Sequence, residues 1–121
     1  MIYFKMETIS INIFNIVGNE ICAEAEDGEK VFELIRRAVQ EDKKVELSFQ
    51  NIMLATTAFL NSAIGKLYKD FDEDKIKQLM QVKEISANTA VSLKRVVTRA
   101  KTFYNDPDAL KNSINNILEE E

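Results

Sequence analysis

Two adjacent threonines, Thr56 and Thr57, are the side chains best placed to do chemistry in this 121-residue chain. They follow a predicted strand and a short turn, and they precede a predicted helix. Such a turn lies at the carboxyl end of the strand, where α/β sheets usually build their sites. A hydroxyl at a helix N-terminus can accept a phosphate, because free backbone N–H groups and the helix dipole stabilise the dianion. The same hydroxyls can instead only cap the helix, and the two residues by themselves leave both roles open.

The residue types that most enzymes rely on are scarce. Histidine is absent and Cys22 is the single cysteine. The first absence removes the commonest general base and transition-metal ligand, and one cysteine cannot form a thiolate cluster. We find no glycine-rich phosphate loop, nucleophile elbow or metal-ligand motif. We therefore expect no enzyme, no cofactor and no metal site, with Cys22 as a small core residue.

The composition also argues against several kinds of partner and location. The chain has 16 basic and 20 acidic residues, for a net charge of −4, which argues against a nucleic-acid partner. No apolar run approaches the ~20 residues of a membrane span, and the start shows no secretory pattern. With its lone cysteine, the sequence predicts a cytoplasmic protein that does not bind a membrane. Its length predicts one domain over residues 1–121.

A strand and a helix must position the threonines. Apolar and polar residues alternate over 45–50, the period-2 pattern of a strand. From Phe59 to Phe71 apolar residues recur at every fourth position, which predicts a helix capped by Thr56 or Thr57. Gly65 lies inside this helix, and we interpret it as a point of close packing on the sheet.

The remaining elements surround this unit. We expect strands over 8–16 and 21–25 that form a hairpin, a helix from Asp27 to Gln40, a weaker strand over 76–82, a helix capped by Ser86, and a fourth helix beginning at Pro107. This order predicts an α/β sheet with helices packed on it. The expected core includes Phe49, Ile52, Phe59, Leu67, Leu93 and Val97. Lys94, Arg95, Arg99 and Lys101 form a basic set on the third helix, and such a set is more often a solvated face than a site for an acidic partner.

The central stretch resembles the STAS domain of bacterial anti-anti-sigma factors. The resemblance rests on the strand, the turn at Asn51, an apolar triplet at 52–54, the tetrad Thr56-Thr57-Ala58-Phe59 and the long helix, and it covers roughly residues 20–104. It is closer to STAS-like domains of unknown function, in which the tetrad reads Thr-Ser-Ser-Phe. In the sporulation-type proteins the tetrad reads Asp-Ser-Ser-Gly and its second serine accepts a phosphate from a partner kinase. Here Ala58 stands at that position and has no hydroxyl, which favours helix capping by the threonines over a phosphoacceptor role.

The resemblance implies a STAS-like mixed β-sheet with helices mainly on one face, plus a C-terminal helix. It also implies a bacterial regulator without catalytic activity, similar to an anti-sigma factor antagonist, whose partner is an anti-sigma-type protein or a histidine-kinase-like ATPase. The implied contact loop contains Asn51, Met53, Ala55, Thr56, Thr57 and Ala58, and phosphate on Thr57 or Thr56 would be absent or incidental. The alternative is a domain that senses a small molecule or nucleotide with the same loop. The sequence is compatible with a homo-oligomer and does not fix the oligomeric state.

Overall fold

A computed structural model describes residues 6–105 of the chain. The elements in chain order are β1 (Thr8–Asn12), α1 (Ile13–Val17), β2 (Ile21–Cys22), α2 (Ala25–Gln40), β3 (Lys44–Ser48), β4 (Leu54–Ala55), α3 (Thr57–Leu60), the π-helix η1 (Asn61–Gly65), α4 (Leu67–Asp70), α5 (Glu73–Leu79), β5 (Met80–Lys83) and α6 (Ala87–Asn105).

The main sheet has three parallel strands in the order β1-β3-β5, and β2 and β4 form a separate two-stranded parallel ribbon. Residues of β3 alternate between the two faces of the main sheet. Val45 and Leu47 are buried under the helices, whereas Glu46 faces outward and pairs with Lys83 of β5 at 3.0 Å. A polar outer face explains why a parallel sheet can leave one side uncovered here.

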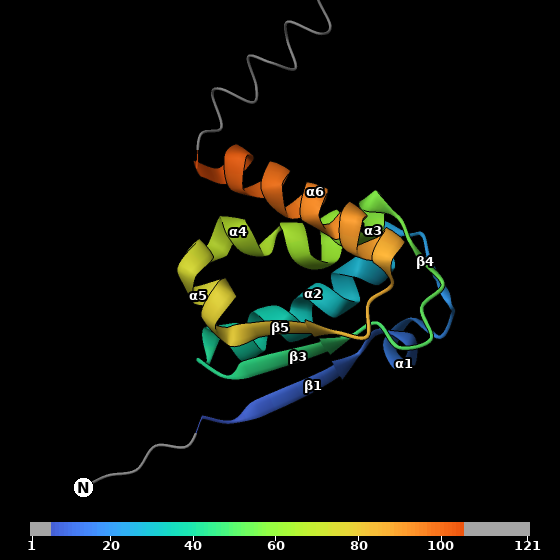
Figure 1. Ribbon diagram of the computed structural model, residues 1–121. Coiled ribbons are helices and arrows are strands. Elements are labelled where there is room, and N and C mark those ends of the chain that lie inside the picture. The colour runs from blue at the N-terminus through green and yellow to red at the C-terminus, as the bar shows by residue number, and fades with distance from the viewer. Residues whose placement is uncertain (1–5, 106–121) are drawn as a thin grey trace, which may run out of the picture.

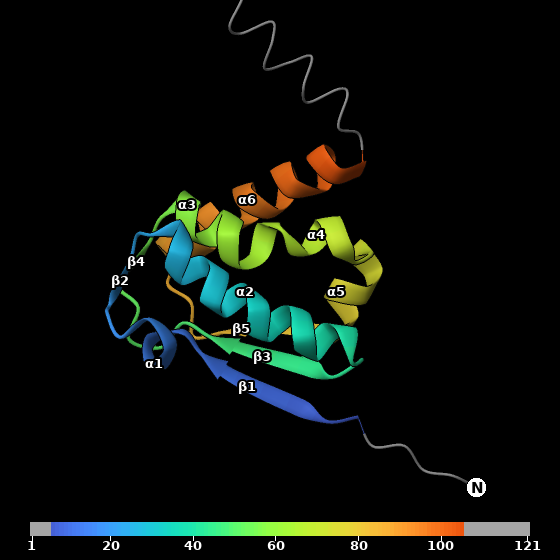
Figure 2. The ribbon, with the colours of Figure 1, turned by 180° about the vertical axis from the view of Figure 1, so that it is seen from behind.

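The helices stack in successive layers on the other face of the main sheet (Figures 1 and 2). Helix α2 packs on β1 and β3, the run α3–η1–α4 packs on α2, and α6 covers that run from outside. The predicted α/β fold, with helices mainly on one face and a C-terminal helix, is therefore confirmed. The sheet is not the mixed one that the resemblance implies, because all strand pairs among residues 6–105 are parallel. The buried positions of Phe49, Ile52, Phe59 and Leu67 are confirmed as well. Leu93 and Val97 are only half-buried, because α6 turns Val96 and Ala100 inward instead.

The predicted hairpin of strands 8–16 and 21–25 is wrong. Strand β1 ends at Asn12, whose side-chain Oδ1 accepts a hydrogen bond from the backbone N–H of Asn15 at 2.9 Å and caps α1. Helix α1 then ends at Gly18, which adopts φ 77°. The extra helix turns the chain away from β1, so that β1 pairs with β3 and β2 pairs with β4.

Two further elements differ from the sequence prediction. Helix α2 begins after Glu24 rather than at Asp27, which lies in its first turn. Helix α5 occupies most of the predicted strand 76–82, because Ile76 and Leu79 are spaced to bury one helical face, and β5 begins only at Met80. The capping role of Ser86 is confirmed, since its Oγ accepts a hydrogen bond from the N–H of Thr89 at 3.2 Å. The predicted helix from Pro107 lies outside the described residues.

The helix predicted after the threonines is not continuous. It is divided into α3, η1 and α4, with the wider π turn in the middle. Gly65 ends η1 and faces α6: a Cβ there would lie 3.4 Å from Val96 Cγ1. The prediction that Gly65 packs closely was right, but its neighbour is α6 and not the sheet.

Candidate functional site

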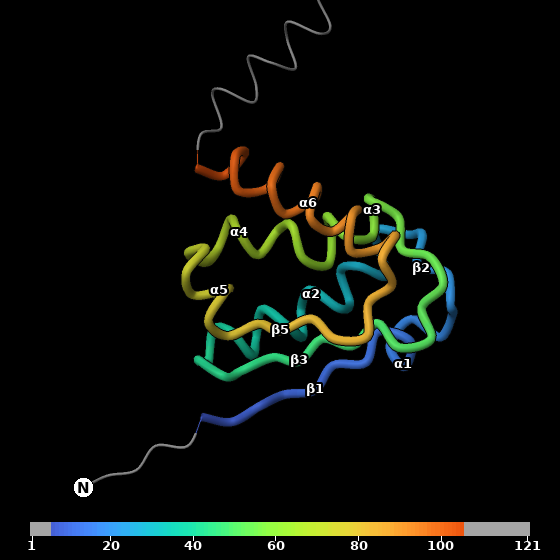
Figure 3. The backbone as a smooth tube through the Cα atoms, viewed as in Figure 1, coloured from blue at the N-terminus to red at the C-terminus, as the bar shows by residue number. Residues whose placement is uncertain are grey.

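The candidate site is the contact loop, residues 51–58, which leaves the carboxyl end of β3 (Figure 3). Asn51 has φ 64°, the left-handed turn conformation that its short polar side chain tolerates. Ile52 next to it is buried and anchors the loop in the core. The backbone N–H of Met53 donates to Glu20 O at 2.8 Å, and that of Thr56 donates to Cys22 O at 3.0 Å. The loop is therefore held along its length and presents a fixed surface.

The two threonines differ in what their side chains do. The hydroxyl of Thr56 donates to Ala23 O at 2.9 Å and accepts from the N–H of Phe59 at 3.2 Å. Thr56 is thus the N-cap of α3 and also joins the loop to the segment before α2. Thr57 and Ala58, by contrast, are exposed in the first turn of α3. Of the two predicted phosphoacceptor candidates, only Thr57 presents its side chain to solvent.

Three exposed apolar side chains belong to the contact loop or to its strand partner β2, and we call them the apolar patch. Met53 is 71% exposed and Leu54 is 51% exposed. The β2–β4 register places Leu54 opposite Ile21, which is 44% exposed. Sequence reasoning placed Met53 and Leu54 in the turn before the helix but missed Ile21, because its position beside Leu54 depends on a pairing between strands far apart in the chain. Ala55, the next residue of β4, is buried. It cannot contact a partner directly, so the prediction that it is a contact residue is wrong.

A groove begins where the contact loop meets α6, and we call it the basic groove. Its volume is about 790 Å³, and it is lined by Thr57, Asn61, Val91, Lys94, Arg95, Val96, Thr98 and Arg99. The predicted basic set on this helix is thereby divided. Lys101 turns the other way and pairs with Glu73 at 2.7 Å, while the other three cations line the groove.

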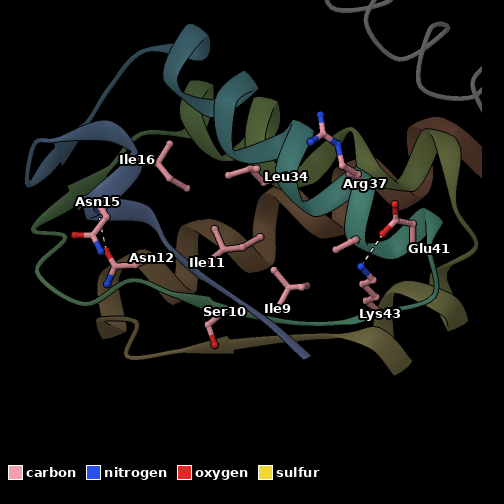
Figure 4. Close-up of a pocket in the computed structure, with 11 residues that line it drawn as sticks. Ile9, Ser10, Ile11, Asn12, Asn15, Ile16, Leu34, Arg37, Glu41 and Lys43 are labelled. Atoms are coloured by element: carbon pink, nitrogen blue, oxygen red, sulfur yellow. Dashed lines mark hydrogen bonds and ion pairs between the residues drawn. The ribbon is translucent and has the colours of Figure 1, made fainter. Parts of the chain in front are cut away.

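A smaller cavity of about 410 Å³ lies on the far side of α2, between that helix, α1 and β1 (Figure 4). Ile11 and Leu34 face each other across it, and Ser10, Asn12, Asn15 and Arg37 add polar groups to the lining. Its rim holds Glu41 and Lys43, which pair at 2.9 Å. The hydrogen bond to Lys43 lowers the pKa of Glu41, and the same contact raises the pKa of Lys43. No residue of the contact loop lines this cavity, so a ligand held there would not use the loop.

Cys22 lies directly beneath the contact loop and is fully buried. Burial, and then the nearby carboxylate of Asp27, raise the pKa of its thiol to about 11. A thiol held in the neutral form is a poor nucleophile and a poor metal ligand. The prediction that Cys22 is a core residue is confirmed.

Residues 6–105 contain neither a candidate metal site nor a candidate membrane-spanning helix. In that part of the chain no three His, Cys, Asp or Glu residues gather where they could hold a metal ion. None of the helices found there combines the length and the apolarity needed to cross a membrane.

A comparison with protein families tests the resemblance to STAS-like domains. Residues 27–90 match the family described as the STAS-like domain of unknown function (DUF4325). The chain belongs to this family. No curated protein and no solved structure matches it. The region shared with the STAS-like family runs from the first turn of α2 through the contact loop to the start of α6. The α6 side of the basic groove, which begins at Val91, lies beyond it.

Proposed function

We propose that this STAS-like domain is a regulatory module without catalytic activity that binds another protein through its contact loop. The observation that carries the proposal is the exposure of Met53 and Leu54 on a loop whose backbone is pinned by hydrogen bonds. Exposed apolar side chains on a preformed surface are typical of protein-binding sites, because they gain from burial while little order is lost. By resemblance to the anti-sigma factor antagonists, the partner is an anti-sigma-type protein or a histidine-kinase-like ATPase of a bacterial cytoplasm. The single cysteine, which can form no internal disulfide, fits that reducing compartment.

The same geometry supports binding that does not depend on phosphate. Ala58 has no hydroxyl, and the hydroxyl of Thr56 is engaged as a cap. A phosphate on Thr57 would add about −1.5 to −2 charges one residue away from the position used by the related proteins. A kinase that presents phosphate with fixed geometry is not expected to accept that shift. We therefore expect constitutive binding.

The alternative is a domain that senses a nucleotide or another small molecule. One observation favours it: the basic groove touches the loop at Thr57, and its volume of about 790 Å³ falls in the range of small-molecule sites. Such sites bury most of their ligand, however, and Val91 in the groove is 53% exposed. The open shape suits a protein segment better.

The proposal is tested with three variants of exposed residues and the natural partner. In a pull-down, Ala58→Arg should abolish binding, because a long charged side chain then stands at an exposed position of the contact loop. Thr57→Ala should leave binding intact, because constitutive binding does not need a hydroxyl at position 57. Gln81→Arg, on the outer face of the main sheet, is the matched control for the added charge.

Phosphosite mapping and intact-mass measurement of protein from the native cell complete the test. High phosphate occupancy on Thr57, with the partner recovered only on the unphosphorylated chain, would overturn constitutive binding. A partner that binds Ala58→Arg as well as the unmodified chain would overturn the contact surface. Saturable binding of a nucleotide panel at physiological concentration, without a protein partner, would favour the alternative.

A further inference from the structure

The basic groove has a charge opposite to that of the chain as a whole. The net charge is −4, yet the groove contains Lys94, Arg95 and Arg99, and no carboxylate from the described residues lines it. These cations stand on neighbouring turns of α6, where like charges repel one another. An anionic occupant would relieve that repulsion.

The described part of the chain provides no such anion. Within residues 6–105, none of the ion pairs involves these three cations. Lys101 on the same helix shows the contrast, since Glu73 holds it at 2.7 Å and the hydrogen bond raises its pKa. The charges of the groove are therefore available to a ligand, whereas that of Lys101 is used within the fold.

The other residues of the groove indicate what kind of ligand fits. Asn61, Thr57 and Thr98 supply neutral hydrogen-bonding groups, while the exposed Val91 supplies apolar surface. Guanidinium groups bind carboxylates through two parallel hydrogen bonds, which gives direction as well as charge attraction. A chain that alternates carboxylates with apolar side chains satisfies both kinds of surface.

We infer that the basic groove binds an acidic segment of the partner protein, which continues from the contact loop across Thr57 onto α6. This inference rests on the proposed function, because it assigns a chemical character to the partner of the same loop. The loop then supplies the apolar contact, and α6 supplies the electrostatic complementarity that speeds association and selects the partner. The α6 side of the basic groove lies outside the family match. It is therefore suited to distinguish partners among proteins that share the loop.

The test uses the full chain and a fluorescein-labelled peptide of four Glu-Glu-Leu repeats, followed by fluorescence anisotropy at low salt. A Gln-Gln-Leu peptide of equal length is the neutral control. We expect the acidic peptide to bind at least about tenfold more tightly than the neutral one, with affinity falling as salt screens the charges. The double variant Arg95→Glu/Arg99→Glu should weaken binding by at least about tenfold. Lys69→Glu/Lys77→Glu, two exposed lysines outside the groove, makes the same change in net charge and should have little effect.

Several results would overturn the inference. These are no binding of the acidic peptide up to millimolar concentration, equal binding of the neutral peptide, or equal loss in the two double variants. Displacement of the peptide by micromolar ATP or pyrophosphate would show that the groove holds a small phosphate ligand instead. A gain of more than tenfold on changing Glu119, Glu120 and Glu121 to Gln would show that the chain's own acidic end competes for the groove.

The inference and the proposed function fail in different ways. If the natural partner binds Arg95→Glu/Arg99→Glu normally but not Ala58→Arg, the loop is the surface and the groove is not part of it. If the acidic peptide binds the groove while Ala58→Arg leaves the natural partner bound, the loop assignment is wrong. Circular dichroism should show the variants at positions 58, 69, 77, 95 and 99 folded, since these side chains are exposed.

Discussion

Replacing Gly28 by alanine is expected to destabilise the protein, although alanine is the better helix former. Gly28 lies in α2 where that helix crosses α3 and η1. An alanine Cβ there would lie 2.6 Å from Phe59 O and 2.7 Å from Ser62 Cβ. Neither atom is the free end of a flexible side chain. The two helices must therefore separate, and this also stretches the 2.7 Å hydrogen bond from Ser62 Oγ to Ala25 O.

The opposing contributions of Gly28→Ala to the free energy of unfolding can be compared in size. Alanine in place of glycine gains about 1 kcal/mol of helix propensity. Overpacking costs about 1–3 kcal/mol, and weakening a buried hydrogen bond costs about 1 kcal/mol more. The net expectation is a loss of about 1–3 kcal/mol in the free energy of unfolding, which corresponds to a fall in Tm of several degrees.

Urea unfolding followed by circular dichroism measures this loss, and Gly65→Ala is the matched control. Its Cβ would meet Asn61 Oδ1 at 3.2 Å, and that atom is the end of a side chain that can move. We expect Gly65→Ala to change the free energy of unfolding by less than about 1 kcal/mol. If Gly28→Ala is as stable as the unmodified chain, or more stable than Gly65→Ala, the close crossing of α2 over α3 is refuted.

Substitutions at Thr56 and Thr57 and the chemistry of Cys22 provide the remaining tests. Thr56→Ala should cost about 1–2 kcal/mol because the α3 cap is lost, and Thr56→Ser should restore most of it; an equal loss in both variants would exclude the hydroxyl as the cause. Thr57→Ala should change the free energy of unfolding by less than about 0.5 kcal/mol, as thermal melts can show. Cys22 should react with iodoacetamide at pH 8 at least about a hundredfold more slowly in the folded chain than in urea, and comparable rates would show an accessible thiol. Because the folded pKa of Cys22 is raised from 9.0 to about 11, the neutral thiol's contribution of about 3 kcal/mol is present below pH 9 and lost as the pH rises through 11. Unfolding curves of the unmodified chain should therefore approach those of Cys22→Ala across that range, and parallel curves would contradict the shift.

The sequence was most informative where local rules decide the structure. The alternation over 45–50 located β3, and the threonines located the start of α3, because strand period and helix caps depend on near neighbours. The alternation of apolar and polar residues also predicted a wrong strand end, because it continues through Ile13. Only the capping side chain of Asn12 shows that the strand has already ended.

The parts that sequence reasoning missed depend on contacts between distant segments. Gly28 shows no local reason for its identity, which follows from Phe59 and Ser62 on another helix. The apolar patch needs the β2–β4 pairing to bring Ile21 beside Leu54. The basic set was visible in the sequence, but the fold decides that Lys101 leaves it and that Thr57 joins it.

Site-specific photo-crosslinking tests the central claim that the contact loop is a protein-binding surface. A benzophenone amino acid replaces Met53 in one variant and Gln81 in another, and the cells are irradiated before the chain is recovered. Both side chains are exposed, but Gln81 lies on the outer face of the main sheet. We predict one crosslinked protein species from position 53, absent from position 81 and lost when Ala58→Arg is added. Equal crosslinking from both positions, or a species that survives Ala58→Arg, would contradict the claim.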